Sequence, residues 1–92
     1  MKTAYGFIEI TGVVAATIAL DTMCKTANVS FVARQCKLGG RLLTIIIEGE
    51  VAAVKEAVEA VKEKTVASAV LANPHPEVLR LIGRFKNGKS KK

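Results

Sequence analysis

One histidine and two cysteines are the side chains of this chain with the most obvious capacity for catalysis. Cys36 and His75 could form a nucleophile and its general base, but nothing in their spacing supports such a pair. A lone histidine is more often structural or exposed than catalytic. Cys24 and Cys36 show neither metal-ligand spacing nor a redox pair motif, so we interpret them as reduced thiols of a cytosolic protein.

The acidic residues also have a structural explanation. Glu48 and Glu50 flank Gly49 just before a predicted helix, where carboxylates favour the positive end of the helix dipole. The sequence contains no phosphate-binding loop, dinucleotide fingerprint or calcium-binding loop. We therefore predict no catalytic residue, no metal ligand and no cofactor.

Residues 36–43, CKLGGRLL, raise a different question. Gly39 and Gly40 lie between Lys37 and Arg41, and apolar runs flank them on both sides. Two glycines fit a primed hairpin turn, in which positive φ is needed. The same bare turn would also fit a place where several copies of the backbone come close together.

Size and composition favour one small domain that gains stability by association. The chain has 92 residues, 50% of them hydrophobic and only 4% aromatic, so its core must be aliphatic. A core of this size is usually only marginally stable, and oligomerisation would bury more surface. No apolar run approaches the roughly 20 residues of a membrane span, and no targeting signal is evident. We predict no membrane partner.

The net charge of +6 invites a nucleic-acid interpretation, but its distribution argues against one. Five of the 14 basic residues fall in residues 84–92, which hold no acid. Residues 1–83 keep nine basic and eight acidic side chains and are nearly neutral. We therefore predict a single domain over residues 1–83, a disordered basic tail over residues 84–92, and no nucleic-acid partner.

Hydrophobic periodicity divides the domain into alternating strands and helices. We expect strands over residues 3–11, 29–37, 41–48 and 66–72, and helices over residues 13–26, 51–64 and 76–83. Pro76 suits the first turn of the last helix, and Gly83 is expected to stop it. The nearly continuous apolar run at 41–48 predicts a strand buried on both faces.

The first two helices differ in their patterns. Val51, Val54, Val58 and Val61 form one buried stripe of the second. In the first, over residues 13–26, Val14, Ile18 and Met23 are assigned to one face, but almost every side is apolar. Such a helix is normally covered on more than one side, and the second cover could come from another subunit.

The order β-α-β-β-α-β with a terminal helix predicts an α+β, ferredoxin-like fold. A four-stranded antiparallel sheet would carry helices on one face, followed by the short C-terminal helix. RNA-recognition modules share this plan, but they stack bases on aromatic side chains of the central strands. The strand at 41–48 has no aromatic residue. The plan alone names no function.

Several short motifs, in order, resemble one known family. They are G-x-I-E in the first strand, K-x-A-N-V after the first helix, K-[apolar]-G-G in the hairpin, G-x-V-x-A-V at the second helix and P-H after the last strand. Together they resemble the hexameric shell proteins of bacterial microcompartments, the BMC-domain family, from about Ala4 to Ile82. Each motif is weak alone, and the combination at these spacings is fairly specific.

The resemblance implies a structural protein without catalysis, located in the microcompartment shell of a bacterial cytoplasm. Six copies would form a flat disc with an axial pore, and discs would tile into a sheet. The implied partners are the other copies of a homohexamer, neighbouring hexamers, other shell proteins, and small metabolites at the pore, with enclosed enzymes as further candidates.

The resemblance also assigns the pore. Mapped residue by residue, Lys37, Leu38, Gly39 and Gly40 fall on the family's pore loop, and glycines there would let six backbones crowd together. The family usually has another glycine where this chain has Arg41. Six Arg41 or Lys37 side chains could make the pore mouth positive and attract anionic metabolites. Alternatively, Arg41 points away and pairs with an acid of a neighbour.

The contact between hexamers is assigned in the same way. Lys25 matches the family's edge lysine and Asn28 its accompanying asparagine, while Pro74 and His75 match the P-H motif. The family usually has an arginine before that motif, and this chain has Asn73. An amide cannot replace a charged, two-pronged guanidinium, so the tiling contact could be weaker or differently arranged.

Two other functions fit the residues less well. A small, ligand-binding regulatory oligomer of ferredoxin-like fold would form a closed assembly and bind one effector saturably. A nucleic-acid binder acting through residues 84–92 would show steep salt dependence that vanishes without them.

Overall fold

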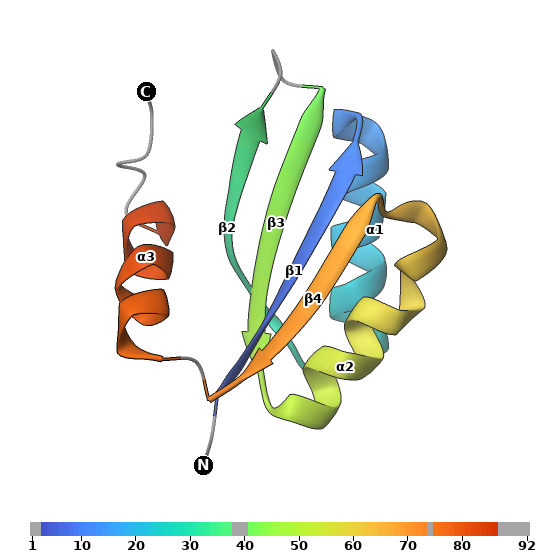
Figure 1. Ribbon diagram of the computed structural model, residues 1–92. Coiled ribbons are helices and arrows are strands. Elements are labelled where there is room, and N and C mark those ends of the chain that lie inside the picture. Colours follow the sequence, from blue (N-terminus) through green and yellow to red (C-terminus); the bar gives the residue numbers. More distant parts are fainter. Residues whose placement is uncertain (1–2, 38–40, 74, 87–92) are drawn as a thin grey trace.

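The computed structural model describes residues 3–37, 41–73 and 75–86 (Figure 1). The elements are β1 (Ala4–Thr11), α1 (Val13–Thr26), β2 (Ser30–Lys37), β3 (Leu42–Gly49), α2 (Val51–Ala60), a 3₁₀ turn (Lys62–Lys64), β4 (Ala67–Ala72) and α3 (Pro76–Lys86). The strands form one antiparallel sheet in the order β2-β3-β1-β4. The predicted α+β, ferredoxin-like fold is confirmed.

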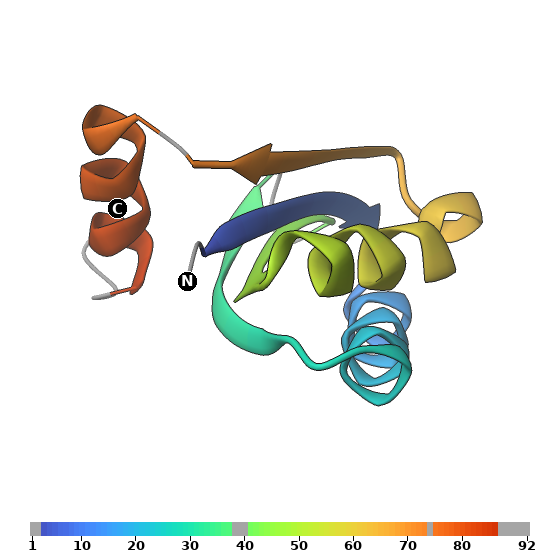
Figure 2. The same ribbon diagram turned by 90° about the horizontal axis from the view of Figure 1, so that it is seen from below.

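The molecule has two layers, a sheet and a pair of helices. Figure 2 shows α1 and α2 on one face of the sheet, while the other face is largely open. Leu43, Ile45 and Ile47 of β3 belong to the core cluster on the helix side, and Ile46 belongs to a smaller cluster on the open side. The third strand is therefore buried on both faces, as its continuous apolar run predicts.

Gly6 allows α2 to approach the sheet closely. A Cβ atom there would lie 2.9 Å from Cγ1 of Val54 and 3.0 Å from Cγ2 of Val58. These two valines and Val61 are fully or almost fully buried, which confirms most of the stripe predicted for this helix. The helix itself ends at Ala60, and the predicted extension to residue 64 is a separate 3₁₀ turn.

The face assigned to α1 is wrong in part. Met23 is buried, but its companions toward the sheet are Ala16 and Ala19. Val14 and Ile18 are 73% and 50% exposed and point away from the core. The small alanine side chains let α1 lie close to the strands, whereas the larger residues remain available on the outside.

The last helix, α3, lies apart from the two-helix layer. It contacts β2, and Val78 packs against the open-side cluster of Val32, Ala33 and Ile46. Gly83 does not stop the helix, which continues to Lys86. It therefore includes the first three residues of the predicted tail, and residues 87–92 lie outside the described part of the chain.

Candidate functional site

The residues predicted to line a pore lie at one end of the sheet. Lys37 ends β2 and pairs with Leu42, the first residue of β3. Arg41 directly precedes β3 and is exposed. Leu38, Gly39 and Gly40 lie outside the described residues, so their conformation stays a prediction.

Arg41 is tied to the junction between β1 and α1. The backbone N–H of Gly12 donates a hydrogen bond of 3.0 Å to the carbonyl oxygen of Arg41. Gly12 adopts a φ of 94°, a region that favours glycine, and it also accepts the first bond of α1 from the N–H of Ala16. One turn thus ends β1, starts α1 and holds the base of the hairpin.

The residues predicted for hexamer contacts gather at the opposite end of the sheet. Ala4, the first residue of β1, pairs with both Gly49 and Ala72. Asn73 follows Ala72, and the carbonyl oxygen of Asn28 lies 3.1 Å from where a Cβ atom of Gly49 would be. At about 3.3 Å per residue, an eight-residue strand places this end some 25 Å from the hairpin.

Lys25 lies in the last turn of α1, which leads to Asn28. Its Nζ atom is 3.1 Å from Oδ2 of Asp21, and 76% of its side chain is exposed. An ion pair this exposed holds the lysine only weakly, so the ammonium group remains free to form other contacts.

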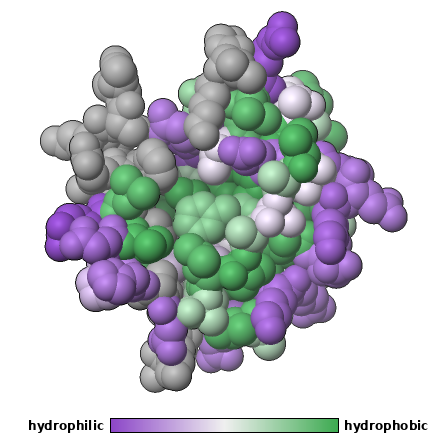
Figure 3. All heavy atoms as spheres, viewed as in Figure 1, coloured by the Kyte–Doolittle hydropathy of each residue, from purple (hydrophilic) through white to green (hydrophobic). Residues whose placement is uncertain are grey.

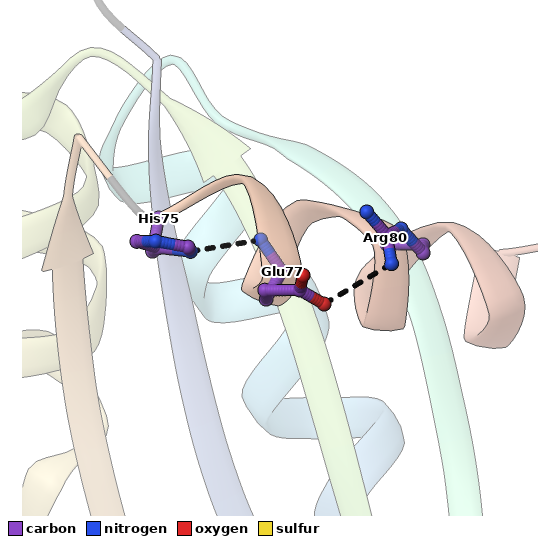
Figure 4. Close-up of polar contacts among 3 residues, drawn as sticks. All are labelled: His75, Glu77 and Arg80. Atoms are coloured by element: carbon purple, nitrogen blue, oxygen red, sulfur yellow. Dashed lines mark hydrogen bonds and ion pairs between the residues drawn. The ribbon is translucent and has the colours of Figure 1, made fainter.

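Asn73 and His75 shape the entrance to α3. Asn73 has a φ of 58°, the left-handed region that asparagine tolerates better than most residues. Nδ1 of His75 accepts a 3.0 Å hydrogen bond from the N–H of Glu77, whose carboxylate pairs with Arg80 (Figure 4). The histidine thus has a capping role within the chain, and Pro74 lies outside the described residues.

The cysteine–histidine pair considered from the sequence is not assembled. Cys36 pairs with Leu43 near the hairpin end of the sheet. His75 follows Ala72, the last residue of β4, at the other end of the sheet. Both cysteines are free and exposed. In the part of the chain that the structure describes, no group of three or more His, Cys, Asp or Glu side chains could hold a metal ion.

The open face of the sheet carries a hollow that sequence reasoning missed. We call the open-face hollow the cavity of about 270 Å³ lined by Phe7, Glu9, Gln35, Thr44, Ala67, Ser68 and Ala69. Figure 3 views this face and shows apolar side chains over the strands with polar ones around them. The strand register aligns Gln35, Thr44, Glu9 and Ala67 in one row, and this pairing could not be derived from local spacing.

A carboxylate lies within this hollow. The hydroxyl of Thr44 donates to Oε2 of Glu9 over 3.4 Å. The glutamate belongs to the G-x-I-E motif, but the motif alone does not show that Glu9 lines a hollow shared by several strands. Its alternation with Ile8 and Ile10 indicates a side chain on the face opposite the main core.

Tyr5 and Glu48 pair across β1 and β3. Burial raises the pKa of the Tyr5 phenol above its ordinary value of 10.0, and the charge of Glu48 and a hydrogen bond to its side chain raise this pKa further. The phenol is therefore neutral in the folded protein near neutral pH.

A second surface lies on the other side of the sheet. A groove of about 330 Å³ between α1 and β2 is lined by Ala16, Thr17, Leu20, Phe31, Arg34 and Ile45. Phe31, in this groove, is 46% exposed. We call Leu20, Phe31 and Arg34 the helix-side patch. Among the described residues, no helix is long and apolar enough to cross a membrane.

Comparison with known proteins places the chain among shell proteins. Residues 4–74 match the model of the BMC domain. The chain is 38% identical over 90 residues to the carboxysome shell protein CsoS1 of Prochlorococcus marinus, covering 90% of this chain and 86% of the relative. It is 40% identical over 82 residues to CsoS1A of Hydrogenovibrio crunogenus, covering 82% of this chain and 84% of the relative.

A solved structure shares the fold. A microcompartment protein from Desulfitobacterium hafniense superposes with a TM-score of 0.75 at 28% sequence identity. The match covers 89% of this chain and 47% of the other, so this chain spans about half the length of that protein. Taken with the sequence relatives, the motifs and the sheet order, the family model assigns the chain: it belongs to the BMC domain family of bacterial microcompartment shell proteins.

Proposed function

We propose that six copies of this chain form a ring that tiles into the shell of a bacterial microcompartment in the bacterial cytoplasm. The ring would enclose an axial pore framed by residues 37–41 and would conduct small metabolites without catalysing a reaction. The carboxysome shell relatives, which are of similar length, support a structural role.

One observation carries the proposal. The residues assigned to the pore and those assigned to the edge lie at opposite ends of the same sheet. A disc needs this separation, because one end of each subunit must lie at the six-fold axis and the other end at the rim of the disc. Glycines at 39 and 40 suit the axial end, where six backbones would crowd together.

The decisive measurement is the native mass by light scattering, with negative-stain microscopy of the same sample. We expect a particle near six times 9.8 kDa and hexagonal discs or sheets. A monomer, dimer or trimer without lateral assembly would contradict the ring and favour the small regulatory oligomer.

The pore charge is tested separately. Six exposed Arg41 side chains would concentrate anions at the pore mouth. Arg41→Ala should then lower anion permeability of reconstituted shells while leaving the ring intact. Lys55→Ala, which removes the same charge from the exposed side of α2, should leave permeability unchanged. Equal permeability of wild type and Arg41→Ala would instead favour an arginine that pairs with an acid of a neighbouring subunit.

A further inference from the structure

We infer that neighbouring subunits of the proposed ring meet through Arg34 of one copy and Glu9 of the next. The helix-side patch of one subunit would cover the open-face hollow of its neighbour. This inference rests on the proposed ring and adds to it the surfaces that join the subunits.

The helix-side patch is apolar and carries a single cation. Leu20 of α1 and Phe31 of β2 line the same groove, and Phe31 is 46% exposed. The guanidinium of Arg34, at the rim of this groove, forms no hydrogen bond or ion pair with the described part of the chain. An exposed aromatic side chain in an apolar groove is suited to contact a partner.

The open-face hollow is complementary in shape and charge. Phe7, Ala67 and Ala69 line it with apolar atoms, and the alanines leave space above β4. Its volume of about 270 Å³ is enough to admit a side chain.

Glu9 supplies the opposite charge. Thr44 donates to Oε2 of Glu9. The two oxygens of a carboxylate offer about four lone-pair positions, so a guanidinium can be accepted in addition to the contacts that Glu9 makes within its own chain. A guanidinium is the side chain best suited to bind a carboxylate with two parallel hydrogen bonds. Gln35, which pairs with Thr44 in the same row of the sheet, adds another polar group to the lining of the hollow.

The positions of the two surfaces determine the kind of assembly. Arg34 pairs with Ile45 and lies on the helix side, whereas Glu9 pairs with Thr44 on the open side. Two different surfaces on opposite faces cannot meet in a twofold dimer of identical patches. They would form a head-to-tail contact, which closes into the proposed ring if neighbouring copies are rotated by one sixth of a turn.

Charge reversal provides the test. Arg34→Glu and Glu9→Arg should each oppose like charges at every contact and reduce the ring to smaller species. A mixture of the two variants should restore hexamers, because every contact of an alternating ring again joins an acid to a base. The two introduced side chains meet at one contact, and the native Arg34 and Glu9 meet at the next. Native mass spectrometry of the mixture should show three copies of each variant per ring.

Far-ultraviolet circular dichroism checks that each variant is folded. If Glu9→Arg fails to fold, the milder set Glu9→Gln, Arg34→Gln and the double variant replaces it. Each single change should raise the protein concentration at which the ring dissociates by about tenfold, and the double variant should be little worse than either.

The outcomes separate the two proposals. A wild-type protein that forms no ring contradicts the proposed function itself. A wild-type hexamer combined with variants that assemble normally, or with a mixture that stays dissociated, contradicts only the Arg34–Glu9 contact.

Discussion

At the scale of single residues, Gly12 links three parts of the molecule. Its φ of 94° ends β1 and starts α1, and its N–H holds the carbonyl of Arg41. Nothing lies within 4 Å of a Cβ atom placed there, so substitution would introduce backbone strain and no collision. The shape of the hairpin base therefore depends on the absence of a side chain at this one position.

Gly12→Ala should lower the free energy of unfolding by about 1–3 kcal/mol, because alanine must adopt a strained backbone conformation. Urea unfolding measures this as a lower midpoint with an unchanged slope. Thr11→Ala, at the adjacent exposed position, is the matched control and should stay within about 0.5 kcal/mol of wild type. Equal stability of both variants would argue against strain at this turn.

Tyr5 makes stability depend on pH in the alkaline range. Because burial and Glu48 raise its pKa in the folded state, the folded protein retains the phenolic proton more strongly than the unfolded chain. Its contribution is complete below pH ~10, the ordinary phenol value, and is lost as pH rises through the raised folded pKa. The free energy of unfolding, measured by chemical denaturation across this pH range, should fall more steeply for wild type than for Tyr5→Phe. Parallel curves for the two proteins would contradict a raised pKa of Tyr5.

At the scale of elements, the start of α3 depends on a side-chain cap. His75→Ala would leave the N–H of Glu77 without its acceptor and weaken the first turn by about 0.5–2 kcal/mol. Hydrogen exchange of the Glu77 amide should then be faster by about 2- to 30-fold. His75→Asn, which offers another acceptor, should exchange at a rate close to wild type. Unchanged exchange in His75→Ala would show that the contact contributes nothing to the helix.

The elements also show how far sequence reasoning reached. The bounds of α1 and the antiparallel plan followed from period and composition, because turns and a glycine separate strongly patterned runs. The buried face of α1 did not follow, because an almost wholly apolar helix offers two candidate stripes and the strands select the one with small residues. The end of α2 and the continuation of α3 past Gly83 depend on tertiary packing and terminal geometry.

Predicted site residues divide in the same way. Lys25 and Asn28 were predicted from a short motif, and Arg41 because it departs from the family pattern just after another. Glu9 and Arg34 became candidates only when strand register and helix placement were known. Local sequence carries no information on which strands are neighbours, so a surface built from several strands cannot be predicted from it.

At the scale of the whole molecule, the isolated chain leaves surfaces that need partners. Among the described residues, no strand pairs with the outer edges of β2 and β4, and apolar side chains are exposed on α1. Unpaired edges and apolar patches promote association. A layer of rings would cover the patches within each ring and leave the far end of the sheet for contacts between rings.

This division predicts that the two kinds of contact can be separated by mutation. Lys25 is exposed, its ion pair with Asp21 is weak, and it lies at the end of the sheet away from the hairpin. Lys25→Ala should therefore leave the hexamer mass unchanged while abolishing or sharply reducing extended sheets in negative-stain images. Lys62→Ala, an equally charged change at an exposed position outside the proposed edge, should preserve both. Sheets of normal extent in Lys25→Ala would show that tiling relies on other residues. Loss of the hexamer itself would show that Lys25 contributes to the contact between subunits of one ring and not to the contact between rings.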